Sequence, residues 1–137
     1  MKALIVGCGR VGSALAKELD QAGWEVVVVD EREKALDLLG DGWRRGFVVG
    51  HGMDTAVLEE AGIAGADLLI AATDGDNTNI VIAQVAKLRY GVQSVAARIQ
   101  DPARADFYAG RGMDVVSPTK SAIADLTRWA LAVGGTA

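Results

Sequence analysis

A glycine-rich segment and an acidic residue further along the chain carry the clearest chemical signal in this sequence. Residues 7–12 read Gly-Cys-Gly-Arg-Val-Gly, and Asp30 follows at the spacing of about twenty residues that dinucleotide sites use. Gly7 permits a tight turn, Gly9 lets a pyrophosphate approach the backbone because it has no Cβ, and Gly12 allows close helix packing. A carboxylate at Asp30 accepts hydrogen bonds from ribose hydroxyls, so the pattern predicts a site for the adenosine diphosphate part of a nucleotide.

Short apolar strands and helical patterns alternate along the chain, and these elements must position the site. Residues 3–6 and 26–29 are apolar at every position, which is typical of parallel strands buried on both faces. The alternation predicts an α/β fold, a doubly wound Rossmann-type parallel sheet of six strands with helices on both faces. We expect strands at about residues 2–6, 25–29, 46–49, 67–72, 94–98 and 114–116, and helices at about residues 10–22, 32–39, 54–61, 76–90, 102–110 and 119–132.

The carboxyl ends of the strands supply the other candidate residues, because ligands of doubly wound sheets lie beyond these ends. Polar groups end the third, fourth and fifth strands, and two charged residues follow Asp30. The negative charge of Asp30 favours a free ribose 2′-hydroxyl and disfavours a 2′-phosphate by repulsion. The predicted nucleotide-binding residues are Gly7, Cys8, Gly9, Arg10, Val11, Gly12, Asp30, Glu31, Arg32, His51, Gly52, Thr73, Asp74 and Arg98.

Two arginines among these candidates have a second interpretation. Arg10 lies inside the glycine-rich loop, where its guanidinium either contacts a phosphate or is exposed to solvent. Arg98 ends an otherwise apolar strand, and it either reaches a terminal phosphate or pairs with Asp74 or Asp76. Asp76 also fits the cap of the helix that follows.

We expect no catalytic and no metal-binding residues. His51 is the single histidine, and catalysis would require a partner that orients or activates it, so we interpret it as a contact to the nucleotide ring or a loop residue. A helix N-terminus can lower the pKa of Cys8, but this cysteine more simply fills space as a small side chain. The sequence contains no Cys/His cluster with zinc spacing.

Composition narrows the class of protein. The chain has 137 residues, half of them hydrophobic, and a formal charge of −4, which fits one domain with a sizeable core and argues against nucleic-acid binding. No apolar run is long enough to span a bilayer, and no signal-peptide pattern opens the sequence. A single cysteine fits a reducing compartment. We therefore expect a cytoplasmic protein without direct membrane insertion.

Two of the expected helices have apolar residues on more of their surface than packing against a single face would bury. Apolar residues cover most of the circumference of the helix near residues 76–90, so it needs cover on a second side, either from a helix of its own chain or from a second subunit. The helix at 119–132 raises the same question through Ile123, Leu126, Trp129 and Val133.

Several segments together resemble the N-terminal domain of the regulator of K⁺ conductance (RCK) proteins, also called the KTN domain. The resemblance spans nearly the whole chain, and its segments 57–63 (Val-Leu-Glu-Glu-Ala-Gly-Ile) and 71–74 with 77–79 (Ala-Ala-Thr-Asp and Asn-Thr-Asn) are more specific than the glycine loop. The other matching segments are residues 5–12, 28–30, 66–67, 97–98 and 112–118.

The resemblance implies a cytoplasmic subunit that senses a ligand for a K⁺ channel or transporter, binds NAD(H) or ATP/ADP, and forms homodimers that assemble into rings. Carried over to matching positions, the glycines, Arg10 and Asp30 would hold phosphate and ribose, and Thr73 and Arg98 would line the same cleft. The family often has an acidic residue after the glycine of the third strand, where this chain has His51-Gly52. We expect a single domain over residues 1–137, without the C-terminal ligand domain common in the family.

The leading functional hypothesis is a regulatory nucleotide-binding module. An NAD-dependent oxidoreductase is the alternative, but the chain leaves no room for a substrate domain and offers no convincing acid–base pair. A structural interaction module with a degenerate site is a third possibility. The glycine-rich pattern addresses only the adenosine diphosphate half of a ligand, so it does not distinguish NAD(H) from ATP or ADP.

Overall fold

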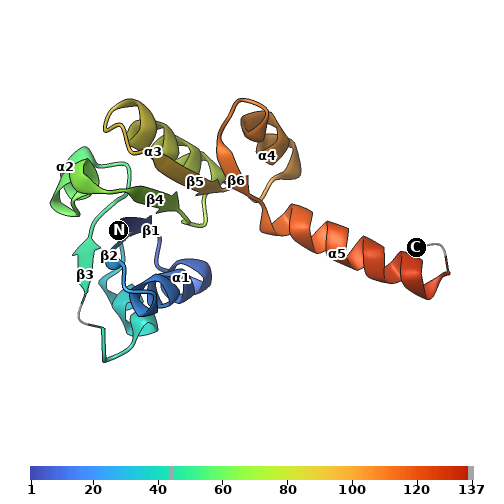
Figure 1. Cartoon of the computed structure of the whole chain (residues 1–137), viewed down its shortest axis with the longest axis horizontal. Coiled ribbons are helices and arrows are strands. Elements are labelled where there is room, and N and C mark those ends of the chain that lie inside the picture. Colours follow the sequence, from blue (N-terminus) through green and yellow to red (C-terminus); the bar gives the residue numbers. More distant parts are fainter. Residues whose placement is uncertain (44, 136–137) are drawn as a thin grey trace.

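The computed structural model describes residues 1–43 and 45–135, and its centre is one parallel sheet (Figure 1). The strand order is β3-β2-β1-β4-β5-β6, and neighbouring strands pair in parallel. The strands are β1 (Lys2–Val6), β2 (Glu25–Asp30), β3 (Gly46–Val49), β4 (Leu68–Ala71), β5 (Ser94–Arg98) and β6 (Asp114–Val116). The doubly wound fold expected from the sequence is confirmed. The strand order reverses direction between β1 and β4, which is where such sheets bind ligands.

The helices follow the expected ranges closely, with one change of type. They are α1 (Arg10–Gln21), α2 (Thr55–Glu60), α3 (Asp76–Leu88), α4 (Pro102–Ala109) and α5 (Pro118–Val133). The expected helix at residues 32–39 is a 3-10 helix, η1 (Glu33–Leu39), and a second short one, η2 (Ile63–Gly65), was not expected. The tighter i→i+3 pattern suits short connecting segments such as these.

Two hydrophobic clusters lie on opposite faces of the sheet. The larger one joins β4 and β5 to α2, α3 and α4, for example through Leu69, Leu58 and Ile82. The smaller one joins β1 and β2 to α1 and η1, for example through Ile5 and Ala35. Figure 1 shows the same division, with α2, α3 and α4 on one side of the sheet and α1 on the other.

The outer side of α3 is only partly covered by the described residues of its own chain. Ile82 and Ala86 are fully buried against the sheet, whereas Val81 is 40% and Leu88 is 86% exposed. The sequence left open whether a helix of the same chain or a second subunit covers α3. No helix within the described ranges buries Val81 or Leu88.

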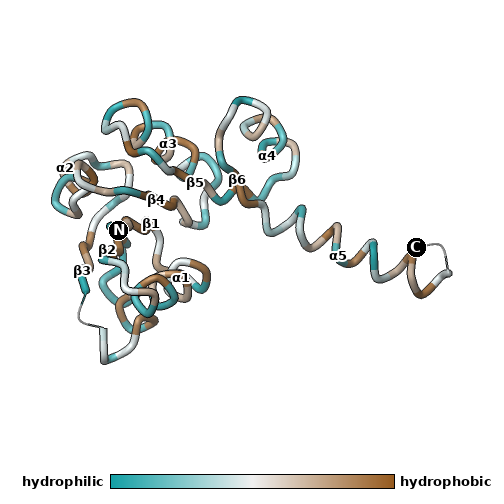
Figure 2. Tube along the Cα trace, viewed as in Figure 1, coloured by the Kyte–Doolittle hydropathy of each residue, from teal (hydrophilic) through white to brown (hydrophobic). Residues whose placement is uncertain are grey.

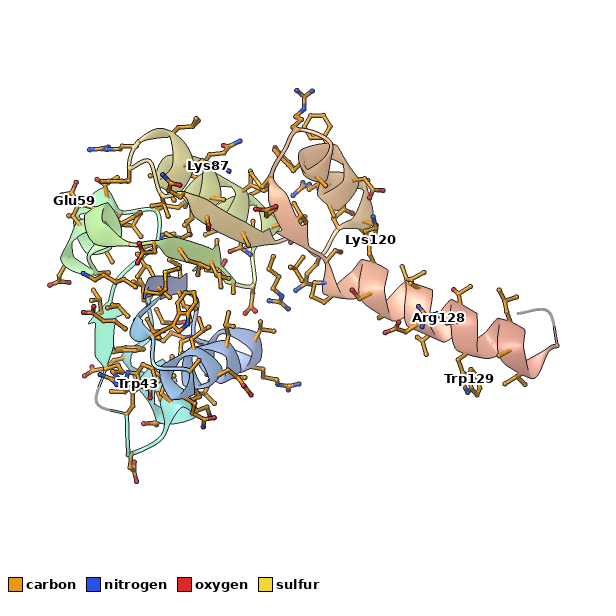
Figure 3. All side chains as sticks on the ribbon, viewed as in Figure 1. Trp43, Glu59, Lys87, Lys120, Arg128 and Trp129 are labelled. Atoms are coloured by element: carbon orange, nitrogen blue, oxygen red, sulfur yellow. The ribbon has the colours of Figure 1, made fainter. Side chains whose placement is uncertain are left out.

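The last helix, α5, stands away from the rest of the molecule (Figure 1). None of its residues is buried. Hydrophobic and hydrophilic residues alternate along it (Figure 2), and the Trp129 side chain projects into open space (Figure 3). The expected helix at residues 119–132 is therefore present, but its side chains Ile123, Leu126, Trp129 and Val133 are each more than half exposed.

Candidate functional site

A cleft of about 200 Å³ lies at the carboxyl ends of β1, β2 and β4, where the strand order reverses. It brings together most of the residues predicted from the sequence: Gly7, Cys8, Gly9, Asp30, Glu31, Arg32, His51, Gly52, Thr73 and Asp74. Four predicted residues do not line it, namely Arg10, Val11, Gly12 and Arg98. Six further residues that were not predicted do line it, namely Val6, Val29, Gly50, Ala72, Gly75 and Thr78.

Gly7 makes the turn that ends β1. Its φ is +107°, in the region that favours glycine, and its N–H donates to the Val29 carbonyl at 2.7 Å. A Cβ at this position would lie 2.6 Å from the Ala72 carbonyl and 2.7 Å from the Thr73 nitrogen. Glycine is therefore required here for two reasons: the backbone conformation, and the close approach of residues 72–73 after β4.

The other two glycines of the loop have opposite surroundings. A Cβ on Gly12 would lie 1.8 Å from the Gly7 carbonyl oxygen, so the start of α1 rests directly on the turn. A Cβ on Gly9 would meet nothing within 4 Å, because this residue faces the cleft. Gly9 is also the N-cap of α1 and makes no side-chain cap. The first N–H groups of the helix are thus left for a ligand, and the helix dipole favours an anion there.

Arg10 and Val11 begin α1 and are exposed. Neither lines the cleft, so a role in ligand binding would come from their backbone N–H groups or from a side chain that turns inward. The two interpretations of Arg10 both remain consistent with this position.

Asp30, the last residue of β2, contacts the backbone of the glycine-rich loop. One carboxylate oxygen accepts the Cys8 N–H and the other accepts the Arg32 N–H, each at 2.8 Å. The side chain of Asp30 is only 9% exposed, so two backbone donors hold it in place. A carboxylate accepts up to about four hydrogen bonds, which leaves capacity for ribose hydroxyls.

His51 and Glu31 form a loose pair at the rim of the cleft. The His51 Nε2 lies 3.7 Å from a Glu31 carboxylate oxygen, and both side chains are about half exposed or more. The His51 Nδ1 accepts the Met53 N–H at 3.2 Å. The next residue, Gly52, is pressed against β1, since a Cβ there would lie 2.4 Å from a methyl group of Val6. The loop is therefore fixed by packing, while its histidine ring remains available at the surface.

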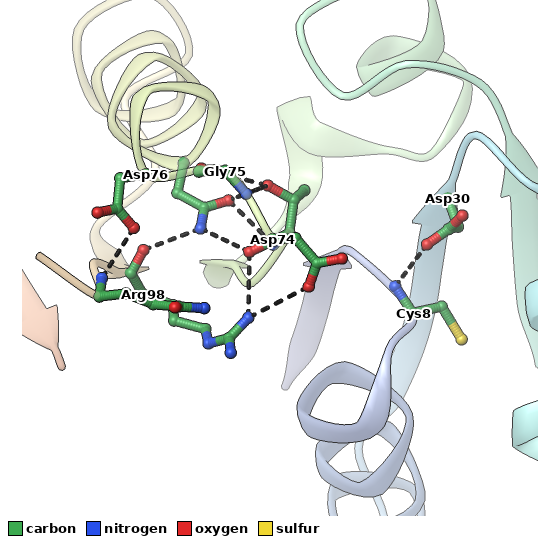
Figure 4. Close-up of polar contacts among 9 residues, drawn as sticks. Cys8, Asp30, Asp74, Gly75, Asp76 and Arg98 are labelled. Atoms are coloured by element: carbon green, nitrogen blue, oxygen red, sulfur yellow. Dashed lines mark hydrogen bonds and ion pairs between the residues drawn. The ribbon is translucent and has the colours of Figure 1, made fainter. Parts of the chain in front are cut away.

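Asn79 holds the opposite wall of the cleft in place and was not among the predicted site residues. Its carboxamide oxygen accepts the Thr73 N–H at 2.9 Å and the Thr73 hydroxyl at 2.6 Å. Its carboxamide nitrogen donates to the carbonyls of Thr73 and Arg98 at 2.9 and 2.8 Å (Figure 4). Asn79 is only 1% exposed. A sequence signal existed, because a buried polar side chain on the apolar face of a helix requires partners of this kind.

Arg98 lies behind this wall and does not line the cleft. Its guanidinium donates to the Thr73 carbonyl at 3.3 Å and lies 3.6 Å from the Asp74 carboxylate (Figure 4). Of the partners proposed for Arg98, Asp74 is therefore the one observed. Its buried Nε has no hydrogen-bond partner among the described residues.

Asp76 has a different role from the one considered for it. Gly75 is the N-cap of α3, and the Asp76 carboxylate accepts the N–H groups of Gln100 and Asp101 at 2.8 and 2.9 Å. Asp76 thereby joins the start of α3 to the loop after β5. Within residues 1–43 and 45–135, no group of three or more His, Cys, Asp or Glu residues is arranged to hold a metal ion.

Burial holds Cys8 in its protonated form. Desolvation, together with the negative charge of Asp30, raises the pKa of the Cys8 thiol from 9.0 to about 11. Its Sγ donates to the Ala35 carbonyl at 3.3 Å. Cys8 therefore fills space beneath the loop, and the helix N-terminus does not activate it.

The arrangement has the features of a binding site. Backbone donors and an unoccluded glycine lie on one side of the cleft, a fixed carboxylate lies at its end, and a hydroxyl-bearing turn at Thr73 lies opposite. Among the described lining residues, two pairs of charged side chains approach each other: His51 and Glu31 at 3.7 Å, and Arg32 and Asp30 at 3.5 Å. The groups present are thus suited to holding phosphate and ribose.

Comparison with known proteins identifies relatives of this chain. A family model described as the TrkA-N domain matches residues 3–118. The chain is 44% identical over 120 residues to the Trk system potassium uptake protein TrkA of Streptomyces coelicolor, a match that covers 88% of this chain and 54% of that protein. The chain thus spans about half the length of that relative.

Solved structures show the same fold. The TrkA-N domain of the inner membrane protein ybaL from Escherichia coli superimposes with a TM-score of 0.82 at 22% identity, covering 93% of this chain and 95% of that one. The structure of GsuK bound to ADP gives a TM-score of 0.77 at 26% identity, covering 92% of this chain and 32% of that one. No helix within the described ranges is long and apolar enough to cross a membrane.

Proposed function

Because the chain belongs to the TrkA-N domain family, we propose that it is a regulatory domain that binds an adenine nucleotide and controls a K⁺ transport system. The match over residues 3–118 confirms the resemblance to RCK N-terminal domains that the sequence carries. The observation that carries the proposal is the cleft over Gly7, Gly9 and Asp30 at the point where the strand order reverses. The ADP bound to GsuK supports the choice of ligand class.

Each wall of the cleft has a proposed role. The N–H groups at the start of α1 bind the phosphates, and the Asp30 carboxylate accepts hydrogen bonds from the ribose hydroxyls. Glu31, Arg32, His51 and Gly52 lie near the adenosine end, and Thr73 and Asp74 contact the distal part of the ligand. NAD(H), ATP and ADP all contain the adenosine diphosphate part that these groups address.

We further propose that the ligand acts as a signal and undergoes no reaction. Binding changes the assembly only if the nucleotide has different affinities for two arrangements of the subunits. The proposed partners are other copies of this chain, as a homodimer or a ring, and a K⁺ channel or transporter at the cytoplasmic side of the membrane. The potassium uptake system named for the Streptomyces coelicolor relative supports the transport role.

Nucleotide titration tests the binding part of this proposal. Calorimetric and thermal-shift titrations with NADH, NAD⁺, ATP and ADP should give saturable binding of at least one of them, with no turnover of the bound ligand. The variant Asp30→Asn should lower affinity by about 10- to 100-fold, because charge-assisted hydrogen bonds contribute about 1.5–3 kcal/mol.

The matched control is Asp37→Asn, which removes a charge from the exposed side of η1 outside the cleft. This control should bind nucleotide as the unmodified chain does. Equal affinities for Asp30→Asn and the unmodified chain would contradict the assigned role of Asp30, and no binding of any nucleotide would contradict the function. Substrate-dependent hydride transfer with NADH would instead support an oxidoreductase.

The transport part needs a test in cells. Deletion of the gene should change K⁺ uptake at low external K⁺, and the unmodified gene should restore it while a gene with Asp30→Asn should restore it less well. Unchanged K⁺ uptake after deletion would contradict the transport role without affecting nucleotide binding.

A further inference from the structure

A second pocket lies at the opposite end of the sheet from the nucleotide cleft. It has a volume of about 260 Å³ and is formed by α3, by the start of β5 and by the segment that joins α4 to β6. The nucleotide cleft lies at the carboxyl ends of its strands, whereas Val95 and Met113 place this pocket at the amino ends of β5 and β6. We call it the α3–α4 pocket, after the two helices that lie on this face of the sheet (Figure 1).

The helix α3 contributes to both cavities but at different ends. Thr78, in its first turn, lines the nucleotide cleft, and Leu88, its last residue, lines the α3–α4 pocket. At a rise of 1.5 Å per residue, these two positions are about 15 Å apart along the helix axis. None of the described residues lines both cavities, so the α3–α4 pocket is a separate site.

The floor of the α3–α4 pocket is apolar. Ala83 and Val95 are 2% and 3% exposed and belong to the larger hydrophobic cluster, and Tyr108 and Met113 pack against that cluster while remaining partly exposed. A turn at Gly112 holds the last two together, because the Met113 N–H donates to the Tyr108 carbonyl at 3.1 Å. An apolar cavity of about 150 Å³ holds benzene, so this pocket has room for an aromatic ring or an alkyl chain.

The rim of the α3–α4 pocket is positively charged. Lys87 of α3 and Arg111 of the turn after α4 are exposed and line it together with Gln84. Neither cation forms an ion pair with another residue in the ranges 1–43 and 45–135. The Arg111 guanidinium lies 4.3 Å from the centre of the Phe107 ring, a contact that orients it without neutralising its charge.

No carboxylate belonging to the described lining residues balances these two cations, although the chain as a whole has a formal charge of −4. Asp114 follows Met113 directly, but it pairs with Ala96, whose neighbours Val95 and Ala97 belong to the cluster on the α3 side. Because successive side chains of a strand point to opposite faces of the sheet, Asp114 points away from the pocket. An anion at this rim therefore meets attraction without a competing acid.

We propose that the α3–α4 pocket binds a small amphipathic anion, namely a carboxylate on an alkyl or aryl body. The carboxylate binds Lys87 and Arg111, whose guanidinium can donate two parallel hydrogen bonds to it, and the apolar body covers the floor. Both parts are needed, because a neutral apolar molecule leaves the two cations unpaired and a small inorganic ion leaves the floor exposed to water. This site goes beyond the proposed function, since it takes a second ligand and does not involve the nucleotide.

Methionine methyl NMR locates the ligand in the unmodified chain. The chain has three methionines; Met113 lines the α3–α4 pocket, whereas Met1 precedes β1 and Met53 lies between β3 and α2. Titration at pH 7 with octanoate and with 3-phenylpropionate should shift the Met113 methyl signal saturably for at least one of them, with a dissociation constant of about 0.1–1 mM. The signals of Met1 and Met53 should stay in place, and a Met113→Leu sample assigns the Met113 signal.

Neutral analogues separate the charge from the apolar contact. Octan-1-ol and 3-phenylpropan-1-ol keep the apolar bodies, and acetate keeps only the charge. Because two exposed ion pairs each contribute modestly to affinity, an alcohol should bind about tenfold more weakly than its carboxylate. Acetate should leave the Met113 signal in place at concentrations that saturate octanoate or 3-phenylpropionate. An alcohol that binds as tightly as its carboxylate, or acetate that binds like the larger anions, would overturn the proposal.

Two double variants test the cations of the rim. Lys87→Gln with Arg111→Gln removes both charges from the α3–α4 pocket, and the matched control, Lys34→Gln with Arg89→Gln, removes the same charges from exposed positions that do not line it. The first double variant should bind the carboxylate about tenfold more weakly and the alcohol with unchanged affinity. The control should bind both as the unmodified chain does. Equal carboxylate affinities in the two double variants would contradict the assigned roles of Lys87 and Arg111.

A second copy of the chain is the competing occupant of the α3–α4 pocket. A Met113 signal that changes with protein concentration and responds to neither carboxylate would mean that another copy covers the pocket. A Met113 signal that responds to neither carboxylate and does not change with concentration would mean that the pocket takes no such ligand. Either result would overturn the proposal, and neither bears on nucleotide binding, because the titrations contain no nucleotide.

Discussion

The two walls of the cleft are built in different ways. The first wall, from β1 and β2, is made of backbone: the turn at Gly7, the start of α1, and N–H groups of Cys8 and Arg32 that hold the Asp30 carboxylate. The second wall, from β4 and β5, is made by one buried side chain, since Asn79 makes four hydrogen bonds to Thr73 and Arg98. Adding atoms to the first wall should therefore lower the free energy of unfolding through steric clashes. In the second wall, the same loss should come from removing hydrogen bonds.

The largest expected effect comes from adding one carbon to the first wall. Gly7→Ala places a Cβ 2.6 Å from the Ala72 carbonyl in a residue with φ of +107°. Left-handed strain costs about 1–2 kcal/mol and overpacking about 1–3 kcal/mol. Urea unfolding should therefore show a loss of about 3 kcal/mol, together with loss of nucleotide binding.

Gly9→Ala is the matched control in the same loop. Its Cβ meets nothing within 4 Å and its φ of −92° suits alanine, so stability should change by less than about 1 kcal/mol. Nucleotide affinity should still fall by about tenfold, because the methyl group occupies the approach to the backbone. Equal losses of stability in Gly7→Ala and Gly9→Ala would contradict the description of the first wall.

The second wall should be sensitive to one change of side chain. Asn79→Leu keeps a similar volume but removes the partners of the Thr73 N–H and the Arg98 carbonyl, and it leaves the Thr73 carbonyl with the Arg98 guanidinium alone. Unsatisfied buried groups cost about 1–3 kcal/mol each, and we expect a loss of about 2–3 kcal/mol in urea unfolding.

Asn77→Leu provides the comparison for this variant. Asn77 is an exposed residue of the same helix, and its side chain accepts a hydrogen bond from Arg104 at 2.7 Å. Exposed substitutions change stability by about 0.5 kcal/mol. A similar loss in both variants would show that Asn79 contributes no more than a surface residue.

The smallest expected effect is the pH dependence that Cys8 gives the first wall. The folded protein holds the thiol proton to a pKa of about 11, whereas the ordinary pKa is 9.0. Between these values the folded state binds more protons than the unfolded state, so the free energy of unfolding falls as pH rises from about 9 to about 11. This stability is fully present below pH 9 and is lost progressively as the pH rises to about 11.

Cys8→Ala isolates that contribution, because other groups that titrate in the same range are common to both proteins. Urea unfolding at several pH values should give a steeper decline for the unmodified chain than for Cys8→Ala. Parallel declines would indicate that the thiol is not held protonated beneath the loop.

Much of the first wall could be predicted from the sequence because its signals are local. Glycines at positions 7, 9 and 12, an apolar strand before them and Asp30 after them form a pattern that can be recognised within about thirty residues, and Gly7 also requires a positive φ. The strands were found for the same reason, since residues 3–6 of β1 and 26–29 of β2 are apolar at every position. The sequence could not show that η1 is a 3-10 helix and not an α-helix, because the two helix types give similar spacings of apolar residues over only seven residues.

The second wall required the tertiary structure. Asn79 and Arg98 belong to different elements, and only the pairing of β4 with β5 brings the Arg98 carbonyl within 2.8 Å of the Asn79 side chain. Arg98 was assigned to the cleft from its place at a strand end, yet its side chain lies behind Thr73. Which way a side chain turns at a strand end depends on its neighbours in space.

By itself the sequence determined the succession of strands and helices along the chain, the glycine turn and the position of the acid at the end of β2. These features follow from the spacing of hydrophobic residues and from the conformations that glycine allows, and both are set within a few neighbouring residues. The tertiary structure alone decided which faces remain uncovered. The exposure of Val81 and Leu88 on α3 depends on which elements lie beside that helix, and the exposure of α5 depends on the single residue that connects it to β6. Both are long-range properties of packing, which local patterns do not encode.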